Sequence, residues 1–211
     1  MKLDFVSDVA CPWCAIGLHA LEEALRRLGP LGLMVELHLQ PFELNPDMPP
    51  EGEDTVTYLA RKYGAPPERL AATRQTLNER GAPLGIRFGA RTRVWNTFDA
   101  HRLLHWAGLQ SAPAQLALKH ALLAAYHTDG RNPGDEQVLV DCAVQAGLDG
   151  EAARGVVRGD DYTAEVRAAE AHWQRLGIHA VPSVVIDDRH LIQGGQPPEV
   201  FEQALRQLAA G

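Results

Sequence analysis

Two cysteines three residues apart, Cys11 and Cys14, are the pair in this sequence best suited to chemistry. In the first turn of a helix, residues at this spacing have Cα atoms about 5.5 Å apart, which suits a disulfide. The free N–H groups and the dipole at a helix start stabilise a thiolate and lower the pKa of a cysteine placed there. We therefore predict that Cys11 attacks a disulfide and that Cys14, one turn inside and more buried, resolves the mixed disulfide.

The dipeptide between the cysteines, Pro12-Trp13, adds no charge to the motif. Any lowering of the pKa of Cys11 must therefore come mainly from the helix terminus and nearby N–H groups. Pro12 fits the first helical turn, where its missing N–H is no loss. We expect the Trp13 side chain to be exposed, and either to contact a substrate protein or to pack on the block of helices inserted later in the chain.

A CxxC motif is also compatible with half a zinc site or with two inert core cysteines. A structural zinc site needs four ligands, and the third cysteine, Cys142, has no cysteine neighbour at short spacing. Cys142 lies in the apolar helical segment 138–144, so we expect it to pack in the core. His101 and His105 have the i, i+4 spacing of a metal pair, but no third ligand is evident. We predict no metal site.

The elements that must position the cysteines form a strand-helix-strand pattern. An apolar run at residues 3–6 predicts a strand, and apolar residues at helical spacing predict a helix up to residue 28. Alternating apolar residues over 33–40 predict a second strand, and the unit is expected to be parallel and right-handed.

The remaining pattern is a block of helices followed by two strands and a last helix. A proline-rich stretch over 41–53 predicts a loop and a domain junction. Either Asn96 or Thr97 is expected to cap the helix that runs to Trp106. Asp54 is expected to cap another helix. Further helices are predicted to begin at 67, 112, 135, 149, 162 and 198, and strands are predicted over 183–186 and 190–193.

These patterns predict an α/β fold with a helical insertion in a chain of 211 residues. The two ends are expected to form one small sheet. We predict a first part of the α/β domain over residues 1–53, an all-helical insertion domain over 54–160, and a second part of the α/β domain over 161–211.

Charge and hydropathy exclude several classes of function. The 27 acidic residues outnumber the 20 basic ones, giving a net charge of −7, which disfavours nucleic-acid and anionic-membrane partners. No apolar run is long enough to span a bilayer. The N-terminus shows no secretory signal, so we expect a cytoplasmic protein with reduced thiols. The arginines at 87, 91 and 93 are expected to be solvated, or to attract an acidic partner or the carboxylates of glutathione.

Three segments carry a resemblance to a known family. They are 7–17 (SDVACPWCAIG), 177–183 (GIHAVPS) and 194–201 (GGQPPEVF). The first resembles the active-site segment of the DsbA family, most closely its FrnE-like branch. The second resembles the cis-proline loop of thioredoxin folds, and the third resembles the last turn and helix of that branch. Residues 96–103 are similar to part of its helical insert.

The resemblance implies a thioredoxin-like fold (βαβ … ββα) with an all-helical insertion. It implies thiol–disulfide oxidoreductase or isomerase activity through a redox-active disulfide without a bound cofactor, on protein thiols and disulfides. The Val181–Pro182 bond is expected to be cis and to hold a substrate strand beside Cys11. The resemblance also makes Asn96, Thr97 and Gln196 candidate substrate contacts.

Two other functions remain open at this point. Kappa-class glutathione transferases and hydroxychromene-carboxylate isomerases look similar in architecture, but they typically have Ser where Cys11 stands. Glutathione could also act as the reductant of a disulfide exchanger. A redox-switched chaperone or binding module would use the CPWC motif only to sense oxidation. Turnover with excess disulfide separates a catalyst from such a switch, and no oligomeric state is predicted.

Overall fold

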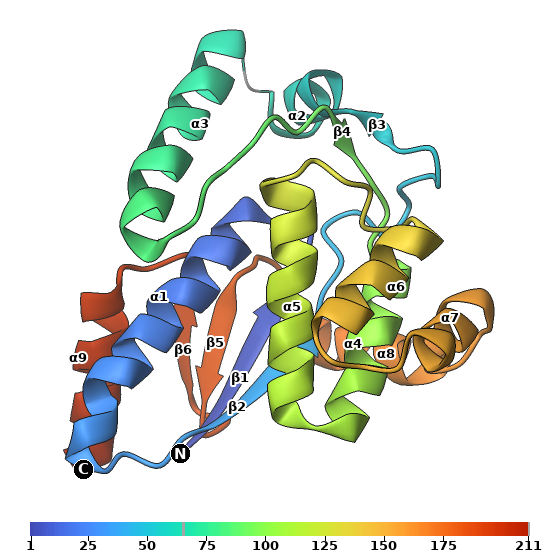
Figure 1. Cartoon of the computed structure of the whole chain (residues 1–211). Coiled ribbons are helices and arrows are strands. Elements are labelled where there is room, and N and C mark those ends of the chain that lie inside the picture. The colour runs from blue at the N-terminus through green and yellow to red at the C-terminus, as the bar shows by residue number, and fades with distance from the viewer. Residues whose placement is uncertain (65, 211) are drawn as a thin grey trace.

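A central sheet of four strands organises the computed structural model, which describes residues 1–64 and 66–210. The strand order is β2–β1–β5–β6, and β1 is parallel to β2 and antiparallel to β5 (Figure 1). The two ends of the chain therefore build one sheet, as the sequence predicts. The strands are β1 (Lys2–Ser7), β2 (Glu36–Pro41), β5 (Ser183–Ile186) and β6 (His190–Gln193).

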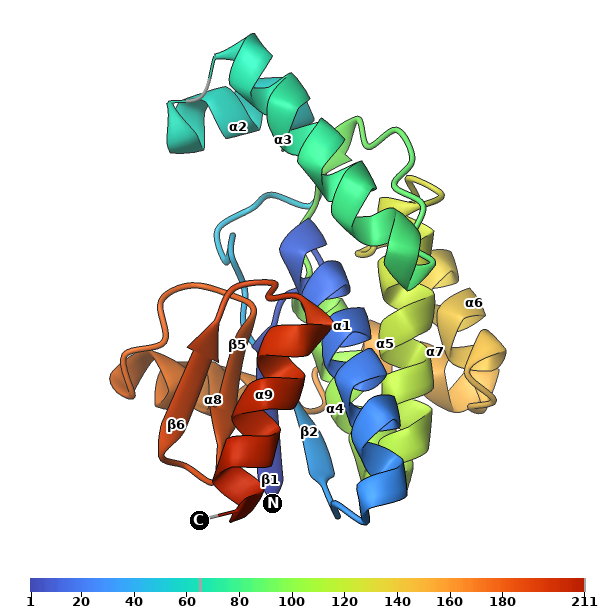
Figure 2. The ribbon, with the colours of Figure 1, turned by 90° about the vertical axis from the view of Figure 1, so that its left-hand side faces the viewer.

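Helices cover both faces of this sheet (Figure 2). α1 (Pro12–Leu28) and α9 (Pro198–Ala210) pack together on one face, and α8 (Thr163–Arg175) lies on the other. Side chains alternate between the faces of β1, because successive residues of a strand point to opposite sides. Phe5 joins the buried cluster of α1 and α9, whereas Val6 packs with Trp173 of α8.

The segment between β2 and α8 is mostly helical. Most helices of its second half pack around one buried apolar cluster, and Leu123 of α5 joins the separate cluster formed by α1 and the sheet. The insertion is therefore packed directly on the helix that carries the cysteines, while the domain limits at 53/54 and 160/161 stay predictions. The helices are α2 (Thr55–Tyr63), α3 (Pro67–Gly81), α4 (Phe98–Gln110), α5 (Ala112–His127), α6 (Glu136–Gln145) and α7 (Gly150–Arg158).

Side-chain caps explain where several of these helices begin. In each case a carboxylate or hydroxyl oxygen accepts a hydrogen bond from an N–H three residues further on, which satisfies a donor that the helix leaves free. Asp54 caps its helix as predicted, and the helices predicted from 135 and 149 start one residue later, because Asp135 and Asp149 are the caps. The capping residues are Asp54, Ser111, Asp135 and Asp149.

The structure differs from the sequence prediction at two places. The second strand begins at Glu36 rather than at residue 33, because its pairing with β1 begins where Glu36 lies opposite Lys2. A further antiparallel pair, β3 (Glu53–Asp54) and β4 (Arg93–Val94), was not predicted. Two residues are too few to show an alternating pattern. None of the described helices is long and apolar enough to cross a membrane.

Candidate active site

Cys11 is the residue that caps the N-terminus of α1. Its backbone is extended, with φ −90° and ψ 112°, and Pro12 occupies the first helical turn. The N–H of Cys14 donates to the carbonyl of Cys11 at 3.0 Å. Both cysteines are free thiols, and Cys11 retains 4% exposure while Cys14 retains none. Cys11 is the more exposed of the two, as predicted, but both cysteines are buried.

Burial raises the pKa of the Cys14 thiol well above its ordinary value, and a hydrogen bond with Cys11 raises it further. The charge of Lys119 opposes this by lowering the pKa of Cys14. A protonated Cys14 therefore donates its hydrogen bond to the Cys11 sulfur. Cys14 therefore carries little thiolate at neutral pH, and the nucleophilic role of Cys11 stays a prediction.

The loop before β5 lies directly beside Cys11. The Val181–Pro182 bond is cis, and the carbonyl oxygen of Val181 lies 3.6 Å from the Cys11 sulfur. A Cβ atom at Gly17 would lie only 2.9 Å from the Pro182 ring, so this close packing requires glycine. The Pro182 carbonyl also accepts from the N–H of Gly194 at 2.8 Å. The structure thus brings together the cysteine motif and the loop that the sequence singled out.

Asp8, which the sequence analysis did not select, anchors the segment before Cys11. Its carboxylate accepts from the N–H groups of Ala10 (3.0 Å) and Leu44 (2.7 Å) and from the hydroxyl of Thr97 (2.8 Å). Burial opposes its ionisation, but the adjacent His101 and these N–H groups hold the pKa of Asp8 below its usual value. An ionised, fully buried carboxylate therefore fixes this loop.

Two side chains of the insertion donate hydrogen bonds to the backbone carbonyls of the two residues that follow Asp8. The Nε2 atom of His127 donates to the carbonyl oxygen of Val9 at 2.8 Å, and Arg91 donates to that of Ala10 at 3.1 Å. Burial, followed by the charge of Arg91, lowers the pKa of His127 to about 3. The imidazole is therefore neutral at physiological pH and donates one fixed hydrogen bond.

Lys119 of α5 is the second functional candidate that the sequence analysis missed. Its side chain is 1% exposed. Burial lowers the pKa of this lysine, and negative charge on Cys14, Asp8 and Cys11 raises it. The available sequence signal was a lysine among Leu116, Leu118, Leu122 and Leu123, since lysine is rarely buried without a partner.

Thr97 is the cap residue of α4, which is one of the two predicted alternatives. Thr97 precedes α4, but its hydroxyl bonds to Asp8 rather than to the helix, and the residue is 3% exposed. The side chain of Asn96 instead accepts from the N–H of Phe98 at 2.8 Å. Gln196 is partly buried and donates to the carbonyl of Gln193 at 2.8 Å. Substrate contact by these residues stays a prediction.

Trp13 is partly buried, so the expected full exposure is wrong. The Arg80 guanidinium of α3 lies 5.4 Å from the centre of the indole ring, at cation–π distance. Arg80 also donates to the carbonyl of Gly195, which packs against the Trp13 backbone. The alternative of packing on the insertion describes this residue correctly.

The weaker sequence candidates have structural roles. Cys142 is 1% exposed, and burial raises its pKa to about 11, as expected for a core thiol. His101 faces Asp8, whereas the His105 ring packs beside Tyr162. The expectation that the arginines at 87, 91 and 93 are solvated is wrong in part. Arg91 donates to the carbonyl of Ala10, and Arg93 donates to the carbonyls of Glu51 and Gly52. Arg87 is exposed.

Comparison with known proteins finds similar chains that cover nearly all of this one. The chain is 36% identical to a solved structure of a probable DsbA oxidoreductase, SCO1869, from Streptomyces coelicolor, with a TM-score of 0.91 over 100% of this chain and 90% of that one. The cytosolic disulfide reductase DsbM from Pseudomonas aeruginosa, solved with GSH, is 18% identical, with a TM-score of 0.68 over all of both chains. The uncharacterized protein YwbO of Bacillus subtilis is 26% identical over 94% of this chain and 92% of its own length.

A family model described as the DSBA-like thioredoxin domain matches residues 2–206, which is nearly the whole chain. The resemblance noted in the sequence and the thioredoxin-like sheet with its helical insertion lead to the same assignment. The chain therefore belongs to the DSBA-like thioredoxin domain family of thiol–disulfide oxidoreductases.

Proposed function

We propose that this protein is a cytoplasmic thiol–disulfide oxidoreductase and isomerase in which Cys11 is the nucleophile and Cys14 the resolving thiol. The observation that carries the proposal is the position of the Cys11 sulfur. It lies at the start of α1, accepts a hydrogen bond from Cys14, and lies 3.6 Å from the carbonyl of Val181. A substrate chain that pairs with Val181 as an added strand would have its disulfide beside this sulfur.

In the first step, the Cys11 thiolate attacks one sulfur of a substrate disulfide. A bond forms between Cys11 and that sulfur, the substrate S–S bond breaks, and the second substrate sulfur leaves as a thiolate that takes up a proton. Cys14 then loses its proton and attacks the Cys11 sulfur. The Cys11–Cys14 disulfide forms, the mixed disulfide breaks, and the substrate leaves with both cysteines reduced. Isomerisation ends instead with a second substrate thiol attacking the mixed disulfide.

The second step requires a buried thiol to lose its proton, and the insertion supplies the group that favours this. The positive charge of Lys119 lowers the pKa of Cys14 against the effect of burial. Because Lys119 is itself buried, its charge acts on Cys14 with little screening by water. We assign Lys119 as a residue that acts through Cys14, because its charge favours formation of the Cys14 thiolate.

Protein thiols and disulfides are the proposed substrates, and glutathione is the proposed reductant. Two glutathione thiols would reduce the Cys11–Cys14 disulfide and leave as glutathione disulfide. The structure of DsbM with GSH and its description as cytosolic support this part of the proposal. In a reducing compartment, net flow towards reduction or isomerisation of substrate disulfides is expected.

The decisive experiment is capture of substrates by a Cys14→Ser variant. Without the resolving thiol, mixed disulfides on Cys11 should accumulate, and mass spectrometry after non-reducing separation should identify peptides joined to Cys11. A Cys11→Ser variant should capture none, and Cys142→Ala should behave as the wild type. Mixed disulfides formed mainly through Cys14 would reverse the assigned roles.

Turnover distinguishes this proposal from the two alternatives. A catalyst should consume excess insulin disulfide in the presence of glutathione, whereas a redox switch should react once for each protein molecule. A glutathione transferase should retain its conjugating activity after Cys14→Ser, because its chemistry needs no resolving thiol. Loss of catalytic disulfide turnover in Cys14→Ser, without conjugating activity in either protein, is the expected result.

A further inference from the structure

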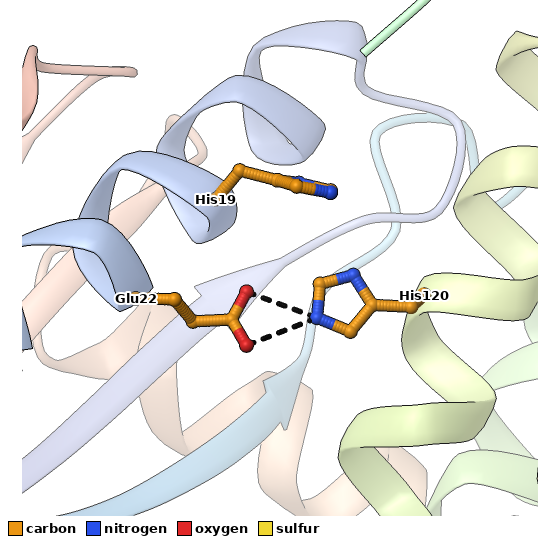
Figure 3. Close-up of side chains that lie close together, drawn as sticks. All are labelled: His19, Glu22 and His120. Atoms are coloured by element: carbon orange, nitrogen blue, oxygen red, sulfur yellow. Dashed lines mark hydrogen bonds and ion pairs between the residues drawn. The ribbon is translucent and has the colours of Figure 1, made fainter. Parts of the chain in front are cut away.

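One turn beyond the cysteine motif, α1 and α5 bring together two imidazoles and a carboxylate. His19 and Glu22 lie three residues apart on α1, and His120 faces them from α5 (Figure 3). The Nε2 atom of His120 lies 2.9 and 3.1 Å from the two carboxylate oxygens of Glu22. One ligand atom from each of the three residues falls within 4.8 Å of the others.

His19 is already oriented as a metal ligand. Its Nδ1 atom lies 2.9 Å from the carbonyl oxygen of Ala15. A carbonyl can only accept, so Nδ1 carries the proton and Nε2 of the neutral ring has a free lone pair. Metal-binding histidines commonly donate their second ring N–H to a backbone carbonyl in this way, because that bond fixes the tautomer and the ring orientation.

The distances between these groups approach those of a coordination sphere. Ligand atoms about 2.0–2.1 Å from a tetrahedral zinc ion lie roughly 3.3 Å from each other. The contact of His120 with Glu22 is close to this value. The rings of His19 and His120 are 4.7 Å apart between centroids and nearly perpendicular, at 77°. Small side-chain rotations would therefore place both Nε2 atoms and one Glu22 oxygen around a single ion.

We propose that His19, Glu22 and His120 form a zinc site that joins α1 to α5. Two imidazoles and one carboxylate are a ligand set that zinc takes with a fourth position left open. On binding, zinc replaces the Nε2 proton of His120 as the partner of Glu22, and that proton moves to Nδ1 or to solvent. No cysteine takes part, so the site is separate from the redox centre.

The surroundings leave room for the fourth ligand. The three residues line a cavity of about 840 Å³ between α1, α3 and α9. The arginines around it are engaged elsewhere: Arg26 and Arg27 with Glu23, Arg27 also with Glu199, and Arg80 with the Gly195 carbonyl. The open position therefore faces a space wide enough for water or a small anionic ligand.

The test is zinc binding to the untagged, oxidised protein, in which the Cys11–Cys14 disulfide keeps those thiols from binding metal. Isothermal titration with zinc chloride should give one ion per chain. His120→Gln and Glu22→Gln should each weaken binding by at least about tenfold. His190→Gln is the matched control, because His190 is exposed on β6, and it should bind zinc as the wild type does. Circular dichroism should show that all three variants are folded.

Cobalt gives a second measurement at the same site. Bound Co²⁺ should show visible d–d absorption without a thiolate charge-transfer band, and the absorption should disappear in His120→Gln. Zinc should also raise the melting temperature of the wild type, because a ligand that binds only the folded state stabilises it. Absence of zinc binding, equal binding by His120→Gln, or a thiolate band in the oxidised protein would each overturn the proposal.

Discussion

His127, at the end of α5, donates from Nε2 to the carbonyl oxygen of Val9, two residues before Cys11, at 2.8 Å. The two residues lie 118 positions apart in sequence, so the insertion directly fixes the segment that leads to Cys11. Arg91 and Thr97 act on the same short segment, at Ala10 and Asp8. The helical insertion is therefore a structural part of the active site.

The neutral, buried imidazole of His127 predicts a loss of stability in acid. The unfolded chain protonates this side chain near its ordinary pKa of 6.5, whereas the folded protein resists protonation down to about pH 3. Between these values the unfolded state binds the extra proton, so the free energy of unfolding falls as pH falls. His127 should contribute about 1.4 kcal/mol per pH unit to this slope.

Urea denaturation at pH 7, 5.5 and 4.5 measures the effect. His127→Gln, which keeps a side-chain N–H donor, should show a flatter dependence on pH than the wild type. His190→Gln should match the wild type, because that histidine is exposed. Equal slopes for His127→Gln and the wild type would show that the imidazole does not titrate as described.

Replacing Lys119 by Met should slow the resolving step. Met fills a similar volume without the charge that lowers the pKa of Cys14, so less Cys14 thiolate forms at neutral pH. We expect release of a mixed disulfide to slow roughly tenfold at pH 7 and to recover at higher pH. The stability of the fold should be equal or greater, because a buried ammonium is costly.

Stopped-flow fluorescence of mixed-disulfide decay against pH checks this prediction. Lys2→Met is the control, because Lys2 lies at the start of β1 and pairs with Asp4 and Asp188. A pH profile for Lys119→Met that overlays that of the wild type would exclude a role of the lysine in resolution.

Thr97→Val should destabilise the protein by about 1–3 kcal/mol, because it removes a hydroxyl that donates to the buried carboxylate of Asp8. Thr97→Ser keeps the hydroxyl and should recover most of that loss. Chemical denaturation gives the free energies, and KM for a disulfide substrate should stay unchanged in Thr97→Val. A raised KM without loss of stability would instead make Thr97 a substrate contact.

Cys142 should be dispensable for exchange. It is buried in α6, and its pKa is raised to about 11, so it carries almost no thiolate near neutral pH. Cys142→Ala should keep wild-type turnover in insulin reduction and lose about 1 kcal/mol of stability for the small volume removed. Iodoacetamide at pH 8 should leave Cys142 unlabelled in the folded wild type. Turnover that falls while the fold is intact would show a third redox thiol.

The residues predictable from sequence are those whose signal is local. Cys11 and Cys14 can be identified from their spacing, which precedes apolar residues at helical spacing. Pro182 lies in a short loop before the apolar run at 183–186. The strand and helix order also follows from local periodicity, and the thioredoxin-like fold with its helical insertion, which the family resemblance implied, was correct. Strand limits failed where a partner decides them, as at Glu36, which can pair only where β1 has residues opposite.

The rest of the site depends on residues far apart in the chain. The sequence does not show that packing buries Lys119 where its charge acts on Cys14. Nor does it show that Leu44 and Thr97 donate hydrogen bonds to the carboxylate of Asp8. His120 has no metal-ligand spacing to His19, from which it is separated by 101 positions. Periodicity and composition do not report such contacts, because only tertiary packing creates them.

The hydrogen bond from His127 of α5 to the loop before Cys11 limits how this protein can be re-engineered. An exchange of the insertion with that of a relative, made to alter which substrates dock, would also remove His127 and Lys119. The recipient cysteines would then meet a different hydrogen-bonding and charge environment. We therefore expect a chimera that keeps its CPWC motif to change in redox reactivity as well.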